Sequence, residues 1–213
     1  MLVRNARRGD TLIEVLFAVT VFSLIVVGSL AIMNQGTSAS RRALETTIAR
    51  QGMDGQAETL RFLHASYVSE YQSGATYNTS DAATSPAEQY FMIIQHAKAN
   101  PKTAASALSN GATSCPTNEP SGSFIVNPST ARLVTNATTM QPATIYPELV
   151  YNTAGVLTAS RGLWVEAVRS ATTTGATSNA GFIDFHIRAC WMAQGSKVPV
   201  TLGTIVRLYE PRG

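Results

Sequence analysis

Charged residues are scarce in this sequence: Asp, Glu, Lys and Arg make up 14% of its 213 residues, and the formal net charge is +3. Three of the 16 basic residues, Arg4, Arg7 and Arg8, lie in the first nine positions, so the rest of the chain has 13 basic and 13 acidic residues. A protein that binds nucleic acid by electrostatic attraction needs a clustered basic face. The balanced remainder of the chain therefore argues against nucleic acid as a partner.

Signatures of catalysis and metal binding are also missing. The sequence has no Gly-x-Ser-x-Gly motif and no glycine-rich phosphate-binding loop. Its three histidines, His64, His96 and His186, fall on separate predicted elements without the spacing of a metal site. Glu166 and Asp184 fall on neighbouring predicted strands, where we interpret them as part of a solvated face. We therefore predict no catalytic residues, no metal site and no cofactor, and we predict that the protein is not an enzyme.

The chain has only two cysteines, Cys115 and Cys190. Their spacing is too wide for a zinc site or a Cys-x-x-Cys motif. Both follow a long apolar segment, and a domain exported beyond such a segment enters an oxidising compartment. We predict that the two cysteines form a disulfide bond, with two buried free thiols as the alternative.

The N-terminal part of the chain is dominated by an apolar stretch. Glu14 is the only charged residue between Asp10 and Arg41, and the residues from Val15 to Met33 are almost all apolar. About 20 such residues span a bilayer core of about 30 Å. The arginines before the stretch, with no acidic residue among them, favour a cytoplasmic N-terminus. The absence of a small-x-small cleavage site after the stretch argues against a secretory signal peptide.

The residues around Gly9 resemble the processing motif of type IV prepilins and type II secretion pseudopilins. A basic leader ends at Gly9, and Asp10-Thr11-Leu12-Ile13-Glu14 leads into the apolar stretch. The resemblance implies that prepilin peptidase cuts after Gly9 and that Asp10 becomes the N-methylated first residue. The family usually has Phe at the position of Asp10. A negative charge beside the new amine would weaken its pairing with Glu14 or slow its methylation.

A carboxylate in a membrane-length apolar helix costs about 2.5–3.5 kcal/mol on insertion scales, so Glu14 needs a cationic partner. By the resemblance, Glu14 and the neighbouring motif residue Thr11 serve assembly, and Glu14 pairs with the terminal amine of an adjacent subunit. The alternative is an ordinary signal-anchor helix that carries a stray glutamate.

The chain is predicted to have three segments: a cleaved leader (1–9), a transmembrane and filament-core helix (10–37) and a globular pilin head (38–213). No proline occurs between Ser38 and Tyr71, and apolar residues recur there at helical spacing. These features predict one helix from Thr11 to about Gln72, about 90 Å long. Its second half belongs to the head.

The rest of the head is predicted to contain a second helix and several strands. Ser85, Pro86 and Glu88 form the start signal of a helix that ends near Asn100. The candidate strands are 124–126, 145–151, 163–169, 182–192 and 202–209. Residues 182–192 alternate between apolar and polar, as in a strand with one buried face. They are predicted to form a hairpin with residues 163–169. Trp164 and Trp191 are expected to fill the core between helix and sheet.

The predicted fold class is α+β: a pilin fold in which the second half of the long helix packs against a C-terminal antiparallel sheet of about 3–5 strands. The function that follows is a structural subunit of an extracellular type IV pilus filament, with adhesion, motility or DNA uptake as roles of the filament. Asp10 and the long, loop-rich head favour a minor pilin over a major one.

The resemblance also implies partners and location. The partners are other pilin subunits, prepilin peptidase, an inner-membrane assembly platform and an assembly ATPase. The precursor is expected to be a single-pass protein of the cytoplasmic membrane, and the assembled chain to be extracellular. The nearest alternative is a type II secretion pseudopilin. A membrane-anchored enzyme or ligand-binding domain is the alternative from another class.

Overall fold

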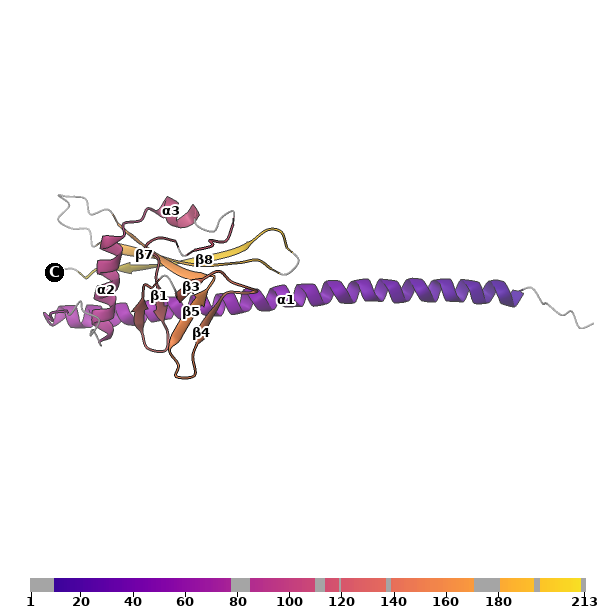
Figure 1. Ribbon diagram of the computed structural model, residues 1–213, viewed down its shortest axis with the longest axis horizontal. Helices are drawn as coiled ribbons and strands as arrows, with labels where there is room; N and C mark the ends of the chain where they lie inside the picture. Colours follow the sequence, from indigo (N-terminus) through magenta and orange to yellow (C-terminus); the bar gives the residue numbers. More distant parts are fainter. Residues whose placement is uncertain are drawn as a thin grey trace, which may run out of the picture. The chain divides into compact units, whose positions relative to one another are not determined.

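The computed structural model describes residues 10–77, 85–109, 114–118, 120–136, 139–170, 181–193 and 196–211. The chain divides into two compact units, Met1–Leu44 and Glu45–Gly213, and each is described by itself. Helix α1 (Asp10–Gln72) contributes its first part to the first unit, and the second unit, here called the head, holds all the other elements (Figure 1). The prediction of one helix from Thr11 to Gln72 is thus confirmed.

Within the head, α1 buries one face. The buried apolar positions recur every three or four residues, as helical geometry requires: Ala49, Met53, Ala57, Leu60, Leu63 and Tyr67. These side chains share one core cluster with helix α2 and with strands from two of the sheets. Beyond Gln72 the chain turns at Gly74, whose φ of +74° favours glycine.

Helix α1 also carries a buried polar side chain, Gln56, which is fully buried. Its amide nitrogen donates to the carbonyl oxygen of Val126 at 2.6 Å, and its amide oxygen accepts from the Val126 N–H at 2.8 Å. Gln56 therefore occupies both backbone hydrogen-bonding groups of a residue in strand β1 (Ile125–Asn127).

Helix α2 (Pro86–Ala99) begins as the sequence predicts. Ser85 Oγ accepts from the Glu88 N–H at 3.1 Å, and Glu88 Oε2 accepts from the Ser85 N–H at 3.1 Å, which completes the capping box. Its buried face includes Tyr90, Ile93 and Ile94. A short helix, α3 (Ala104–Ser109), follows.

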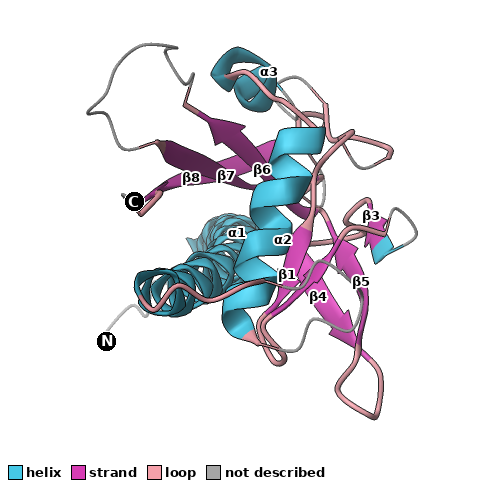
Figure 2. Ribbon diagram, turned by 90° about the vertical axis from the view of Figure 1, so that its left-hand side faces the viewer, coloured by secondary structure: helices cyan, strands magenta, loops and turns pink. Residues whose placement is uncertain are grey.

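The main sheet is antiparallel, in the order β6-β7-β8: β6 (Leu163–Arg169), β7 (Phe182–Trp191) and β8 (Val200–Tyr209). The predicted hairpin of 163–169 with 182–192 is confirmed, with Leu163 opposite Ala189 and Arg169 opposite Ile183. One face of β7 packs into the core cluster shared with α1 and α2: Ile183, Phe185, Ile187, Ala189 and Trp191. Figure 2 shows α2 crossing in front of the strands.

Two smaller sheets complete the head. Strand β1 pairs with β2 (Arg132–Val134), and β5 (Leu157–Arg161) lies between β3 (Met140–Gln141) and β4 (Glu148–Tyr151). The β3–β5 pair is parallel. Strands β2, β3 and β5 were not predicted. The candidate strand 145–151 begins too early, since β4 begins at Glu148, after Pro147.

The alternation along residues 182–192 is typical of a strand with one buried and one solvated face, but in part of β7 the second face is buried as well. His186, Arg188 and Cys190 point to the face opposite the core, yet their exposed fractions are only 3%, 8% and 1%. The region around α3 contacts β6, and Cys115 packs against Trp164, Met140 and Cys190. Trp164 therefore lies in this second cluster, whereas Trp191 lies in the main core as predicted.

Gly162 joins the smaller sheet to the main sheet. It lies between β5 and β6 at φ +63°, and a Cβ there would approach the Cys190 carbonyl oxygen to 2.4 Å. Its N–H donates to the Gln141 carbonyl at 2.7 Å, and its carbonyl accepts from the Cys190 N–H at 2.8 Å. Only glycine fits this close approach of three backbone segments.

Candidate functional site

The first unit presents an apolar helical surface. All described side chains from Leu12 to Leu44 are exposed, including Leu16, Phe17 and Phe22. By length and composition this helix can cross a membrane, and none of its most apolar window is buried within the chain. A helix that is apolar all round has to be buried by lipid or by other chains. The segment is thus compatible with a single-pass membrane anchor.

The three hydroxyl groups between Val15 and Met33 are satisfied within the helix. Thr20 Oγ1 donates to the Phe17 carbonyl at 2.8 Å, and Ser23 Oγ donates to the Val19 carbonyl at 2.7 Å. Ser29 Oγ makes the same kind of bond. These hydroxyls do not require water, so they add little to the cost of placing the helix in an apolar environment.

The predicted processing residues lie at the beginning of the helix. Gly9 is outside the described residues, and α1 begins at Asp10. Glu14 follows one turn later, about 6 Å further along the axis, with an exposed side chain. Its carboxylate is the only charge in the apolar stretch, and it lies close to the position where cleavage after Gly9 would create an amine.

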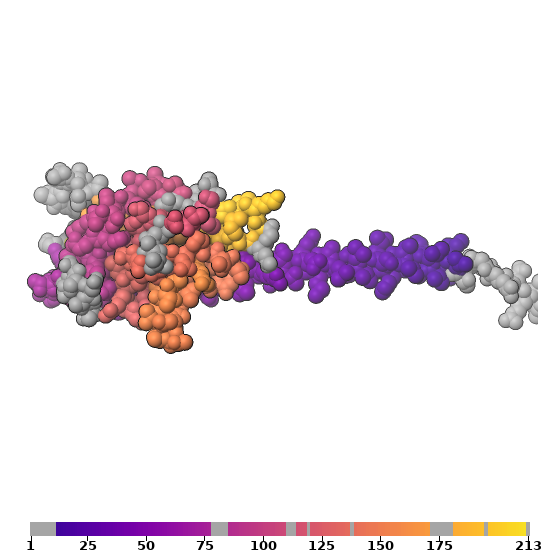
Figure 3. Space-filling model, viewed as in Figure 1, coloured from indigo at the N-terminus to yellow at the C-terminus, as the bar shows by residue number. Residues whose placement is uncertain are grey.

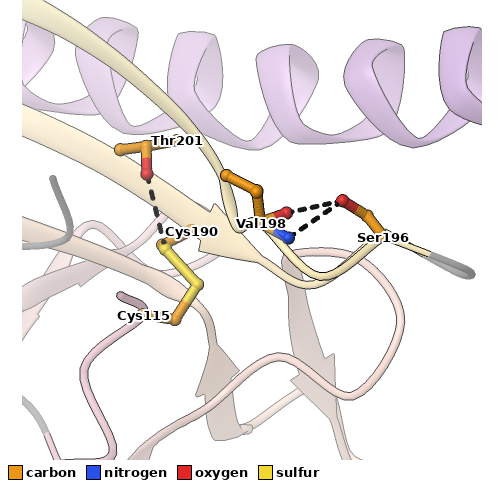
Figure 4. The surroundings of a disulfide bond; sticks show 5 residues. All are labelled: Cys115, Cys190, Ser196, Val198 and Thr201. Atoms are coloured by element: carbon orange, nitrogen blue, oxygen red, sulfur yellow. Dashed lines mark hydrogen bonds between the residues drawn. A yellow bond between two sulfur atoms is a disulfide. The ribbon is translucent and has the colours of Figure 1, made fainter. Parts of the chain in front are cut away.

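The head contains the predicted disulfide. Cys115 and Cys190 are bonded; their Cα atoms are 5.4 Å apart, and the two residues are 75 positions apart in the sequence. Figure 4 shows the bond beside Thr201, whose Oγ1 lies 3.5 Å from Cys190 Sγ. The bond ties the segment after α3 to the last residues of β7.

Next to the disulfide lies a buried polar cluster. Glu166 has an exposed fraction of 0%, its Oε1 accepts from Lys102 Nζ at 3.0 Å, and its Oε2 accepts from Trp164 Nε1 at 3.1 Å. Glu166 lies opposite His186 in the sheet, and Asp184 lies opposite Val168. The interpretation of Glu166 and Asp184 as a solvated pair of carboxylates is therefore wrong.

Asp184 belongs to a separate group nearer the surface. Both of its carboxylate oxygens accept from Arg207, at 2.7 and 2.8 Å. The Arg207 guanidinium also lies 3.9 Å above the centre of the Phe182 ring. The hydrogen bonds to Asp184 raise the pKa of Arg207 further, so its guanidinium stays charged at any pH used for a folded protein.

The three histidines have separate environments. His64 Nε2 lies 2.8 Å from the Tyr209 carbonyl oxygen, and His96 Nε2 lies 3.2 Å from the Gly122 carbonyl oxygen. Burial, and then the charge of Arg188, lower the pKa of His186. Among the described residues, no group of three His, Cys, Asp or Glu side chains could hold a metal ion.

The head has two hollows of note. A groove of about 500 Å³ is lined by Glu58, Thr59, Phe62, Pro86 and residues 128–131. The only carboxylate in its lining, Glu58, is paired with Arg61. A cavity of about 20 Å³ adjoins the disulfide and Trp164. The other polar residues of the groove lining are Thr59, Ser129 and Thr130.

Sequence reasoning missed two buried polar contacts of the head, the ion pair of Lys102 with Glu166 and the bonds of Gln56 to Val126. Lys102 and Gln56 find their partners 64 and 70 residues away in the chain, so no local pattern marks them. Comparisons of the chain with protein-family models, with curated proteins and with solved structures find no match.

Proposed function

We propose that this chain is a type IV pilin-like structural subunit, anchored in the cytoplasmic membrane and then assembled into an extracellular filament. The observation that carries the proposal is the first part of α1: its described side chains are all exposed from Leu12 to Leu44 and carry a single charge, Glu14, before Arg41. The Gly9 motif and the basic leader support a processed N-terminus. The α+β head fits the same architecture.

Assembly would transfer the apolar helix from lipid to a bundle of neighbouring helices. Lipid chains are as apolar as leucine, so close packing rather than the hydrophobic effect drives association. Gly28 and Ser29 are small enough to allow helices to approach closely. Glu14 would pair with the terminal amine of a neighbouring subunit and fix the axial register, a role in specificity that a buried ion pair can have.

The head would be held on its helix by polar contacts as well as apolar ones. Trp191 Nε1 donates to Glu45 Oε2 at 3.0 Å, at the first residue of the head. Glu45 is 8% exposed and Trp191 1%. This bond links the end of β7 to α1, so the start of the head is anchored to the helix that assembles.

The cleavage step is tested by changing Gly9. The variant Gly9→Val is expected to keep its leader, because the resemblance makes the small residue before the cut the determinant of processing. Mass spectrometry of the N-terminal peptide measures both the cut and the methyl group. The control Asp10→Phe, which introduces the family's usual residue, should be cut. A normally processed Gly9→Val chain would contradict the proposal.

The assembly step is tested by Glu14→Ala. This variant should be cut normally but be lost from sheared filaments, because the neighbouring amine would be buried without a counter-charge. The matched control is Glu58→Ala, which removes an exposed glutamate from the head portion of α1 and should assemble. Unchanged incorporation of Glu14→Ala would remove this residue from the mechanism. Abundance of the unchanged chain in sheared filaments separates a major from a minor pilin.

A further inference from the structure

The two edge strands of the main sheet, β6 and β8, differ in whether another backbone segment pairs with them. The outer edge of β6 is covered by Phe124, whose N–H and carbonyl both bond to Val165, at 2.9 and 2.8 Å. On the other side, β8 pairs only with β7 within the described part of the chain. An uncovered edge strand is a template for pairing with another chain.

The backbone groups that face this open edge can be identified. The Glu210 N–H donates to the Gly181 carbonyl at 2.7 Å, which fixes the alternation of hydrogen-bonded pairs between β7 and β8. By that alternation Leu208, Val206 and Thr204 bond to β7. The N–H and carbonyl groups of Arg207, Ile205 and Gly203 therefore point away from the sheet, and among the described residues no bond to them is found.

Beta-sheet edges are usually protected, and β8 has little of this protection. It is ten residues long, contains no Pro and no Lys, and pairs with β7 without a register shift. At the C-terminal end of the strand, the Tyr209 carbonyl oxygen lies 2.8 Å from His64 Nε2 of α1. Ile205 at the middle of the strand and Tyr209 at its end have exposed fractions of 53% and 56%.

The strand is also complementary to itself. In an antiparallel pair of two β8 strands centred on Ile205, Arg207 faces Gly203 of the second copy, so two like charges never face each other. Leu208 faces Leu202, and Val206 faces Thr204, on the core side of the sheet, where they would extend its apolar face. A register centred on Thr204 would pair as many residues of the strand, with Arg207 opposite Thr201, but it would place Ile205 opposite Gly203. Centring the pair on Ile205 instead packs the two exposed Ile205 side chains against each other.

We propose that two heads of this protein associate through their β8 edges, antiparallel and centred on Ile205, into one continuous six-stranded sheet. The pairs 205–205, 203–207 and 207–203 each exchange both backbone hydrogen bonds. The contact is isologous, with the same strand on both copies. It concerns the head alone and does not depend on whether the N-terminal helices form a filament.

The pairing is tested by cross-linking the full-length chain in detergent micelles. With Ile205→Cys, mild oxidation should give a disulfide-linked dimer on a non-reducing gel, since Cα atoms of such a pair lie about 5.5 Å apart. The control is Val156→Cys, equally exposed at 54% on the tip of the β4–β5 hairpin, which stands out from the head in orange in Figure 3. The control should stay monomeric. Failure of Ile205→Cys to cross-link, or equal cross-linking of both variants, would overturn the proposal.

A second measurement uses amide hydrogen exchange. The N–H groups of Ile205 and Arg207 should become protected as protein concentration rises, while those of Thr204 and Val206, bonded to β7, stay protected throughout. The variant Ile205→Pro removes only an outward N–H and should abolish the concentration dependence at Arg207. Protection of Arg207 that does not depend on concentration would show that the edge is covered within one chain and would also overturn the proposal.

Discussion

Replacing Cys115 and Cys190 together with serine is expected to lower the free energy of unfolding of the head by about 4.5 kcal/mol, because the bond closes a loop of 75 residues in the unfolded chain. The native stability of a domain is typically only about 5–15 kcal/mol, so this loss is large. The measurement is denaturant unfolding followed by tryptophan fluorescence, since the only tryptophans of the chain, Trp164 and Trp191, both lie in the head.

The control for this experiment is the unchanged chain in reductant. Once reduced, it should unfold at the same denaturant concentration as the double serine variant, and in the absence of reductant it should be much more stable. A double variant as stable as the oxidised chain would show that the disulfide contributes nothing. Trp164, which packs in the cluster beside the bond, should report the change most directly.

Replacing Glu166 with alanine is expected to cost about 3–5 kcal/mol of stability, the usual result of removing one partner of a buried ion pair. The side chain of Lys102 is only 15% exposed, and in this variant its ammonium group would lose the Glu166 carboxylate as its partner. The Trp164 N–H would lose its acceptor at the same time. Denaturant unfolding of Glu166→Ala and of Glu166→Gln, which keeps an acceptor for Trp164, separates the two contributions.

The matched control for Glu166 is Glu148→Ala. Glu148 also pairs with a cation, Arg161 at 2.7 Å, but the two side chains are 32% and 35% exposed. Water screens such a pair, so the expected cost is less than about 1 kcal/mol. A second comparison replaces both partners, with Lys102→Met and Glu166→Leu, and should restore most of the stability. Equal losses for Glu166→Ala and Glu148→Ala would contradict the importance of burial.

Local patterns were enough to predict much of the fold. The helical spacing of apolar residues predicted α1, the sequence Ser85-Pro86-x-Glu88 predicted the start of α2, and the alternation along β7 predicted its hairpin with β6. Each of these depends on residues close together in the chain. The disulfide between Cys115 and Cys190 was predicted from export and from the absence of any other cysteine.

The features that were missed depend on distant partners. Alternation along β7 shows that the strand has two faces, but it does not show that the region of α3 and Cys115 covers the second face. Trp164 and Glu166 were placed wrongly for this reason. Strands β2 and β3, of three and two residues, are too short to have a recognisable period, and β3 is defined by its pairing with β5, 20 positions further on.

Some features of the candidate site follow from the sequence alone, and others are added by the structure. The Gly9 motif is read from the sequence alone, because Gly9 lies outside the described residues. The structure adds that Glu14 follows the start of the helix by one turn and that the serine and threonine hydroxyls beyond it are bonded within the helix. Partners, processing and location therefore stay predictions.

The carboxamide of Gln56 limits how the head can be joined to other helices. It imitates a peptide group, so it pairs with Val126 as a neighbouring strand would. The residues one turn before and after it, Gly52 and Leu60, offer no such group. A head shifted along α1 by one turn would leave the Val126 donor and acceptor buried and unbonded. Grafting this head onto a foreign N-terminal segment therefore requires a junction placed ahead of Gln56.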